Sequence, residues 1–253
     1  MEYTHRFYRR GYRQADMAHF NAAVAETDLD IGVNKEQYSA ELVSYSKDII
    51  KNVRRPLEEY IKRDPGFLTS LAPRELLPGF PKIAGVMADA AFVAGVGPMA
   101  AVAGAIAEAV GEVLAGRCRE VIVENGGDIY MKTGAARRVG IFAGESVLSG
   151  RVAIEIEPKQ TPIGICTSSG KVGPSLSFGK TDAVVILSKS AALADAVATA
   201  CGNIVQSADD LEKALDFAVK IKEVSGAVII IGDHLGVRGD VKLVKGEGNI
   251  GAI

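Results

Sequence analysis

Apolar residues recur every three or four positions in four stretches of the chain, and this spacing predicts four helices. Pro56 lies inside the first of them and is expected to kink or split it. The second begins at Pro98, a residue suited to a first helical position, and ends at Gly116. The predicted helices cover 45–63, 98–116, 191–204 and 209–224.

Short apolar runs between these stretches predict β-strands. They do not alternate regularly with the helices, which favours an α+β fold over a doubly wound sheet. The chain has no repeat of 20–50 residues and no low-complexity linker, so we predict a single domain over 1–253. The predicted strands lie mostly within 1–44 and at 120–124, 138–142, 151–157, 163–167, 182–187 and 227–231.

The stretch 191–204 carries the main functional hypothesis, because it is apolar on almost every side and is therefore expected to be buried. Asp195 lies in its middle, with Thr199 one turn further on the same face. A buried carboxylate needs a positive partner, and a hard cation held by Asp195 and the Thr199 hydroxyl would supply one. The alternative is that Asp195 caps a neighbouring loop and that Thr199 bonds to its own helix.

Two glycine-containing loops could contact a ligand. Gly126 and Gly127 follow an apolar strand and could leave backbone amides open, with Asp128 facing the site or capping the turn. The alternative is an ordinary turn. A second loop offers hydroxyls and amides suited to phosphate or ribose oxygens, the alternative being an unspecialised Gly/Ser loop. Its candidate residues are Ser168, Ser169 and Gly170.

Gly97 and Cys166 are further candidates. Gly97 belongs to a Gly-x-Gly pattern before Pro98, which favours a helix N-terminus lining an anion pocket over a Rossmann loop, with close helix packing as the alternative. Cys166 precedes the serine loop and could be a thiolate nucleophile or a sulfur carrier, or a small buried residue.

Composition excludes several classes of protein. The 29 basic and 31 acidic residues nearly cancel, so no nucleic-acid partner is expected. The three cysteines are widely spaced and odd in number, which favours a reducing compartment over a disulfide framework. The charged N-terminus lacks the apolar core of a signal peptide, and no uninterrupted apolar run spans a membrane, so we expect a cytoplasmic protein without a membrane partner.

Three of these segments resemble the ApbE-like flavin transferase superfamily. The sequence ADAVATA at 194–200 resembles its closing signature, ENGGDI at 124–129 its Gly-Gly-Asp strand, and CTSSG at 166–170 its Thr-Ser-Gly loop. The order and rough separations also match. The longer stretches around 93–108 and 166–185 resemble a smaller cytoplasmic branch of the superfamily, over most of the chain.

The resemblance implies an ApbE-like, T-fold-related α+β domain with a pocket for FAD or a related nucleotide. It also implies Mg²⁺ held by Asp195 and Thr199. The nucleotide would contact Gly97, Gly126, Gly127, Ser168, Ser169 and Gly170, and the candidate catalytic residues are Asp128 and Cys166.

The chain departs from the superfamily between the serine loop and the closing helix. The His-x-x-Asp-Pro segment expected there is absent from 171–181, which puts transfer of FMN to a protein in doubt. Two alternatives therefore stand beside a flavin-dependent enzyme. One is a sulfur-assimilation enzyme or accessory protein that forms homocysteine, with Cys166 as its residue to test, and the other is a non-catalytic flavin-binding protein. The expected partner is a small-molecule nucleotide, and the chain could also form a homo-oligomer.

Overall fold

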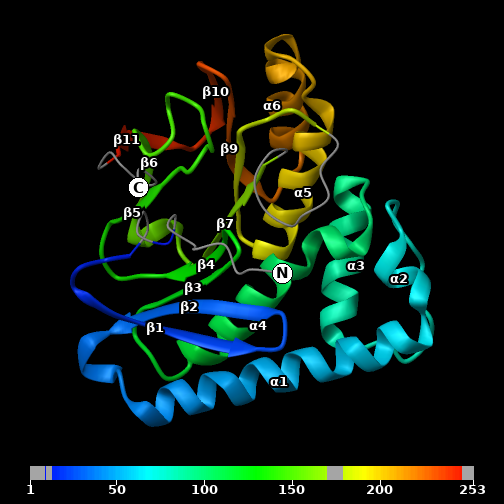
Figure 1. Cartoon of the computed structure of the whole chain (residues 1–253), viewed down its shortest axis with the longest axis vertical. Coiled ribbons are helices and arrows are strands. Elements are labelled where there is room, and N and C mark those ends of the chain that lie inside the picture. Colours follow the sequence, from blue (N-terminus) through cyan, green and yellow to red (C-terminus); the bar gives the residue numbers. More distant parts are fainter. Residues whose placement is uncertain (1–8, 10–12, 170–178, 247–253) are drawn as a thin grey trace.

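The computed structural model of the protein describes residues 9, 13–169 and 179–246. Its strands form two antiparallel sheets, and helices cover one face of the larger sheet (Figure 1). Apolar side chains fill the space between this sheet and the helices, and a second apolar cluster lies on the other face of the sheet. The predicted α+β class, with antiparallel sheets and packed helices, is confirmed.

The larger sheet has eight strands in the order β1-β2-β3-β4-β7-β8-β9-β10, and all neighbours are antiparallel. Two strands were not predicted from the sequence: β4, which follows β3 after a two-residue turn, and β10, none of whose residues is buried. The strands are β1 (Met17–Val24), β2 (Thr27–Asn34), β3 (Val121–Asn125), β4 (Asp128–Lys132), β7 (Ile163–Ser168), β8 (Ala183–Ser188), β9 (Val224–Ile231) and β10 (His234–Gly239).

The smaller sheet has three strands in the order β11-β6-β5. Its inner residues, such as Ile154 and Ile156, pack with Ile129 and Ile165 of the larger sheet. The strand β11 was not predicted from the sequence. The strands are β5 (Arg137–Gly140), β6 (Val152–Ile156) and β11 (Lys242–Lys245).

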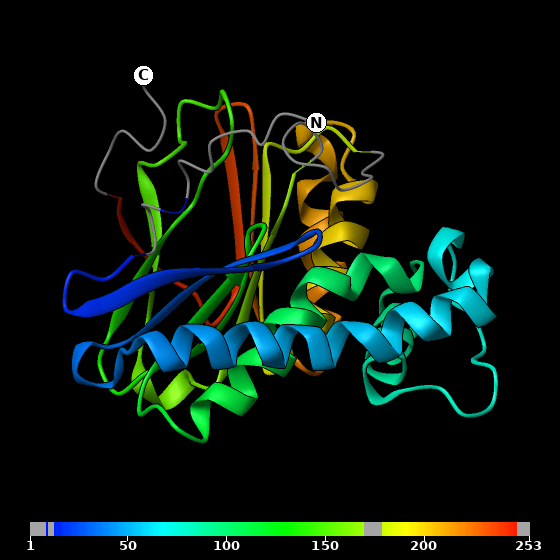
Figure 2. The same cartoon turned by 60° about the horizontal axis from the view of Figure 1, so that its bottom comes forward.

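The helices form the remaining layer, with α1 running along its outer side (Figure 2). The α-helices are α1 (Ala40–Arg63), α2 (Pro65–Thr69), α3 (Lys82–Ala94), α4 (Val102–Ala115), α5 (Ala191–Ile204) and α6 (Leu211–Lys220). Short 3₁₀ helices are η2 (Lys35–Gln37), η3 (Pro98–Ala101), η4 (Pro158–Gln160) and η5 (Ala208–Asp210).

Several helix predictions are confirmed and others corrected. The helix α5 has the predicted bounds, and the capping box of Ser207 and Asp210 opens η5 just before α6. The helix α1 begins earlier than predicted, where the Ser39 hydroxyl accepts the Leu42 amide at 3.1 Å, and it continues through Pro56. The Gly-x-Gly pattern follows a helix, α3, rather than a strand, which removes the Rossmann interpretation.

The predicted helix at 98–116 consists of η3 followed by α4. Pro98 begins η3 and Gly116 caps the end of α4, as predicted. By length and composition alone, Pro98–Ala115 could cross a membrane, and half of it is buried inside the fold. A core helix of a globular protein has the same character.

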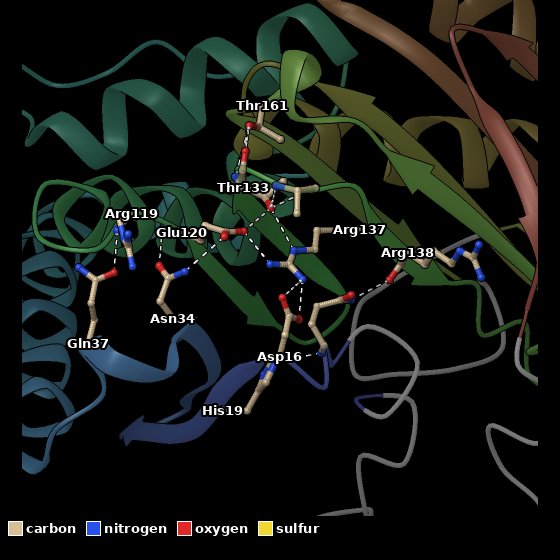
Figure 3. A network of polar contacts seen from close by, with 12 residues as sticks. Asp16, His19, Asn34, Gln37, Arg119, Glu120, Thr133, Arg137, Arg138 and Thr161 are labelled. Carbon is tan, nitrogen blue, oxygen red and sulfur yellow. Dashed lines mark hydrogen bonds and ion pairs between the residues drawn. The ribbon is translucent and has the colours of Figure 1, made fainter.

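The two sheets are joined by a polar network around the buried Arg137, which lies at the start of β5 (Figure 3). Its guanidinium donates to both carboxylate oxygens of Asp16, at 2.6 and 2.8 Å, and to Glu120 at 2.7 Å. A fourth bond reaches the Thr133 hydroxyl at 3.0 Å. Burial favours the neutral form of Arg137, but its two carboxylate partners outweigh this effect and raise its pKa. The side chain therefore stays charged where it connects the layers.

Candidate functional site

The register of β4 and β7 brings two predicted site residues together. Asp128 is paired directly with Cys166 across these strands, and both are buried. The Cys166 thiol donates to the Ala191 carbonyl at the start of α5, at 3.2 Å, so this pair faces the helix layer. Ser168, two residues further along β7, lies on the same face.

The β3–β4 turn closes one side of this site. Gly126 and Gly127 have φ values of +70° and +108°, the backbone of a two-residue hairpin turn. The Gly127 amide donates to the Glu124 carboxylate at 2.8 Å, and the Gly127 carbonyl accepts from Thr167 at 3.2 Å. The Gly127 amide is therefore engaged within the protein, which favours the ordinary-turn alternative for this group.

Asp195 enters the same site from α5. Its Oδ2 accepts the Gly104 amide of α4 at 2.9 Å. This amide lies in the first turn of α4, where the helix itself provides no acceptor. Asp195 thus caps a neighbouring element, as the alternative hypothesis anticipated, although the element is a helix and not a loop.

The charges around Asp195 remain unbalanced. Asp195 is partly exposed, less buried than predicted, and the burial of its carboxylate still raises its pKa to about 7, even though the amides of Gly104 and Ala103 favour the ionised form. Burial, followed by repulsion from Asp195, raises the pKa of Asp128 well above its usual range. Neither carboxylate forms an ion pair with a Lys, Arg or His within 9, 13–169 and 179–246. A pair of crowded carboxylates in this state favours binding of a cation.

Thr199 lies one turn beyond Asp195 and is partly exposed. Its hydroxyl makes no hydrogen bond within the part of the chain that the structure describes, including to its own helix. It remains available as an oxygen ligand next to Asp195.

The oxygen atoms of Asp195, Thr199 and Asp128 suit a magnesium site that is completed by a ligand. Among the described residues, no group of three or more His, Cys, Asp or Glu side chains could hold a metal ion. Magnesium usually binds through one or two carboxylates, with water and substrate phosphates completing its octahedron. Asp195, Thr199 and the nearby Asp128 therefore fit Mg²⁺ bound together with a phosphate-bearing ligand.

Cys166 is poorly suited to the role of nucleophile. Its side chain is fully buried, and burial and the carboxylates of Asp128 and Asp195 raise the pKa of its thiol well above the usual range. A thiol in this setting stays protonated near neutral pH, whereas the thiolate is the reactive form. These facts favour the alternative that Cys166 is a buried packing residue. Cys118 and Cys201 are also free and buried.

The remaining candidates are placed as follows. Ser168 is buried at the end of β7 and Ser169 follows it, partly exposed, whereas Gly170 lies outside the described residues. Gly97 packs so closely that a Cβ there would overlap the Ser70 carbonyl oxygen. This contact favours the close-packing alternative for Gly97.

Sequence reasoning missed several polar residues around the site. Glu124 is fully buried and accepts Arg9 Nε at 2.8 Å, which ties the N-terminal segment to the β3–β4 turn. The Asn125 side chain donates to the Ala103 carbonyl at 3.0 Å and so joins this turn to α4. Both residues lie in the ENGGDI segment, whose resemblance could have pointed to them. Glu108 is the third, and it is the one acidic residue in the first half of an otherwise apolar helix.

A surface groove among the described residues lies away from the Asp128 and Asp195 carboxylates. It has a volume of about 280 Å³ and is lined by residues of α1, α3 and α4, including Val53, Lys82, Glu108 and Glu112. It includes neither Asp128 nor Asp195. We therefore place the candidate site by its carboxylates, and not by this groove.

The fold defines the class of protein. The fold is that of the ApbE flavin transferases. The apo structure of the Pseudomonas stutzeri flavinyl transferase ApbE superposes with a TM-score of 0.55 over 91% of this chain and 95% of that one, at 12% identity. The Vibrio cholerae flavin transferase ApbE gives a TM-score of 0.52 over 92% and 98% of the two chains, at 15% identity.

Sequence comparison places the chain more narrowly. The family model described as AbpE bacteria matches residues 9–243, and the chain belongs to this family. A UPF0280 protein of Methanococcus maripaludis is 40% identical over 229 residues, which is 88% of this chain and 91% of the relative. A UPF0280 protein of Methanocella arvoryzae is 46% identical over 200 residues, 78% and 81% of the two chains. The predicted membership of an ApbE-like branch is confirmed.

Proposed function

We propose that this protein is a transferase-type enzyme that binds FAD or a related nucleotide together with Mg²⁺ at Asp195. The observation that carries the proposal is the pair of crowded carboxylates, Asp128 and Asp195, without a cationic side chain beside them in the described part of the chain. A divalent cation would relieve their repulsion, and a nucleotide diphosphate would complete its coordination.

The surrounding residues have separate roles in this proposal. Asp195 and the free hydroxyl of Thr199 would hold the cation, which would neutralise the phosphate charge when bound. Ser168 and Ser169, at the end of β7, would contact the phosphates or the ribose. The β3–β4 turn would form the adjacent wall and present Asp128.

Asp128 is the candidate proton-transfer group. Its raised pKa suits a side chain that must hold and release a proton, and it lies beside the proposed cation ligand. The absence of His-x-x-Asp-Pro from 171–181 argues that the acceptor differs from the protein segment used in FMN transfer. We therefore propose nucleotide-dependent transfer to a different acceptor.

Calorimetry of FAD binding tests the proposal. The wild-type protein is expected to bind FAD in the presence of MgCl₂ and at least tenfold more weakly in EDTA. Asp195→Asn should lose the magnesium-dependent part of the affinity, because the amide cannot replace the carboxylate as a cation ligand. The matched control is Asp89→Asn, since Asp89 also lies in an alanine-rich helix but is exposed. Equal magnesium dependence in wild type and Asp195→Asn would contradict the assignment.

The fate of the nucleotide separates an enzyme from a flavin-binding protein. FAD recovered intact after long incubation with Mg²⁺ and candidate acceptors would favour the non-catalytic alternative. Appearance of AMP, measured by chromatography, would show that the diphosphate is cleaved. An Asp128→Asn variant that retains FAD binding but forms no AMP would assign proton transfer to Asp128.

A further inference from the structure

The helices α4 and α5 cap each other's first turns. Asp195 of α5 accepts the Gly104 amide of α4 at 2.9 Å. In return, Glu108 of α4 accepts the Ala192 amide of α5 at 3.1 Å and the Ser190 hydroxyl at 2.9 Å. Each carboxylate therefore satisfies a donor that its partner helix cannot satisfy alone.

This exchange fixes the relative position of the two helices. Gly104 faces Asp195 and Glu108 faces Ala192, so the helices run antiparallel along their contact. At Gly104 a Cβ atom would overlap the Ala191 carbonyl oxygen, which shows how closely the backbones approach. Sliding of α5 along α4 would break both caps together.

We propose that Glu108 is a positioning residue, which holds α5 in the register that places Asp195 at the cation site. The effect of Glu108 on cation binding at Asp195 rests on the proposed function. Its effect on the position of α5 relative to α4 does not. Glu108 acts on the proposed cation site indirectly, because its hydrogen bonds go to Ser190 and Ala192 and not to Asp195. The effect travels through the first turn of α5, from Ser190 and Ala192 to Asp195 one turn later.

A carboxylate suits this task because it accepts two hydrogen bonds with the same oxygen. Glu108 Oε2 receives both donors, one from a hydroxyl and one from a backbone amide. Its negative charge also lies at the positive end of α5. The Ser190 hydroxyl meanwhile accepts the Leu193 amide, so the first turn of α5 is bound on two sides.

Hydrogen exchange measured by NMR tests the positioning role. In Glu108→Ala, the Ala192 amide is expected to exchange roughly five- to tenfold faster, as for other lost helix caps. The decisive amide is Gly104, on the other helix, which should also accelerate because its acceptor Asp195 moves with α5. The Val123 amide of strand β3 reports global unfolding, and the acceleration at Gly104 is expected to exceed any change at Val123.

Matched variants separate positioning from general destabilisation. Glu108→Gln keeps an acceptor oxygen and should restore Gly104 protection to near the wild-type value. Glu112→Gln is the control, because Glu112 lies one turn further on α4, is 54% exposed and pairs with Lys82 instead of α5. If Glu108→Ala does not fold, Glu108→Asp replaces it, since its carboxylate is one methylene too short to reach Ala192.

Magnesium affinity completes the experiment, with Mg²⁺ alone as the titrant. Glu108→Ala should bind Mg²⁺ about tenfold more weakly, and Glu108→Gln should bind nearly as wild type. Faster exchange at Ala192 with unchanged exchange at Gly104 would overturn the proposal. If wild type binds no Mg²⁺ but Gly104 responds as expected, the proposed function fails while the positioning of α5 by Glu108 stands.

Discussion

Asp30 and Glu124 are direct partners across β2 and β3, and both are fully buried. Each carboxylate has its own arginine from the segment before β1. Arg13 forms an ion pair with Asp30, and Arg9 forms one with Glu124. The N-terminal arginines therefore neutralise two acids that would otherwise repel each other on one face of the sheet. Arg9 and Arg13 therefore have a structural role in this sheet.

The Asp30 pair predicts a loss of stability in acid. Burial alone would raise the pKa of Asp30, but hydrogen bonds from His19 and Arg13 outweigh it and hold that pKa below its ordinary value. The stabilisation is fully present above the unfolded pKa of about 3.9, and it is lost as the pH falls through the lower folded value. Urea unfolding between pH 7 and pH 2.5 should show this decline, and Asp30→Asn should make it shallower. The exposed Asp48 provides the control, as Asp48→Asn should leave the slope unchanged.

Removing one partner of the Arg9–Glu124 pair should be more harmful than removing both. Arg9→Met leaves the Glu124 carboxylate buried next to Asp128, and we expect a loss of about 3 kcal/mol in the free energy of unfolding. Glu124→Gln in the same chain should recover part of this loss, because the fully buried Glu124 charge is then removed. A double-mutant cycle measured by urea unfolding gives the coupling energy. A coupling near zero would show that the pair contributes nothing.

Features of the fold that depend on neighbouring residues could be predicted from the sequence, whereas those that depend on contacts between distant residues could not. The bounds of α5 follow from local periodicity, and Pro98 and Gly116 mark the ends of the η3–α4 segment within a few residues. The strand β10 could not be found in this way, because half-exposed residues leave no clear pattern. The caps between α4 and α5 join residues more than 80 positions apart.

The candidate site could be predicted only in part, because its residues come from segments far apart in the chain. A single acidic residue in an apolar helix indicated Asp195, and the same reasoning applied to Glu108 would have found the second cap. The resemblance to a known family placed Asp128 in the site, but the register of β4 and β7 showed that it faces Cys166. The high pKa of that thiol depends on this neighbour and on burial, and neither can be read from the residues around Cys166.

Asp128 should lower the stability of the protein, because its carboxylate is buried beside a second one. Its carboxylate is buried and is repelled by Asp195, so Asp128→Asn removes a like-charge contact. We expect the variant without ligand to gain about 2 kcal/mol in the free energy of unfolding, measured with urea at pH 8. MgCl₂ should stabilise the wild type by more than it stabilises the variant. A variant less stable than wild type would show that Asp128 makes structural contacts that outweigh the repulsion.

Arg137 should be among the most important polar residues for stability. Its side chain is 5% exposed and binds Asp16, Glu120 and Thr133 (Figure 3). Arg137→Met leaves the largely buried Glu120 carboxylate without its cationic partner and should cost about 3 kcal/mol. Arg137→Lys should recover little, because an ammonium cannot reproduce the forked geometry of the guanidinium. The neighbouring Arg138 is 61% exposed, and Arg138→Met should change the free energy of unfolding by less than about 0.5 kcal/mol.

Gly104 tests whether the close approach of α4 and α5 is required. In Gly104→Ala the new Cβ would overlap the Ala191 carbonyl oxygen, so the helices must separate, and we expect a loss of about 2 kcal/mol in the free energy of unfolding. The control is Gly85→Ala in α3, where the nearest atoms belong to the half-exposed ring of Phe80, which can rotate away. Because alanine is the better helix former, this control should be neutral or slightly more stable.

Separation of the helices also withdraws Asp195 from its amide donor, so magnesium affinity should fall in Gly104→Ala and stay unchanged in Gly85→Ala, as measured by calorimetry. An unaltered affinity in a destabilised Gly104→Ala would mean that Asp195 binds the cation without support from α4.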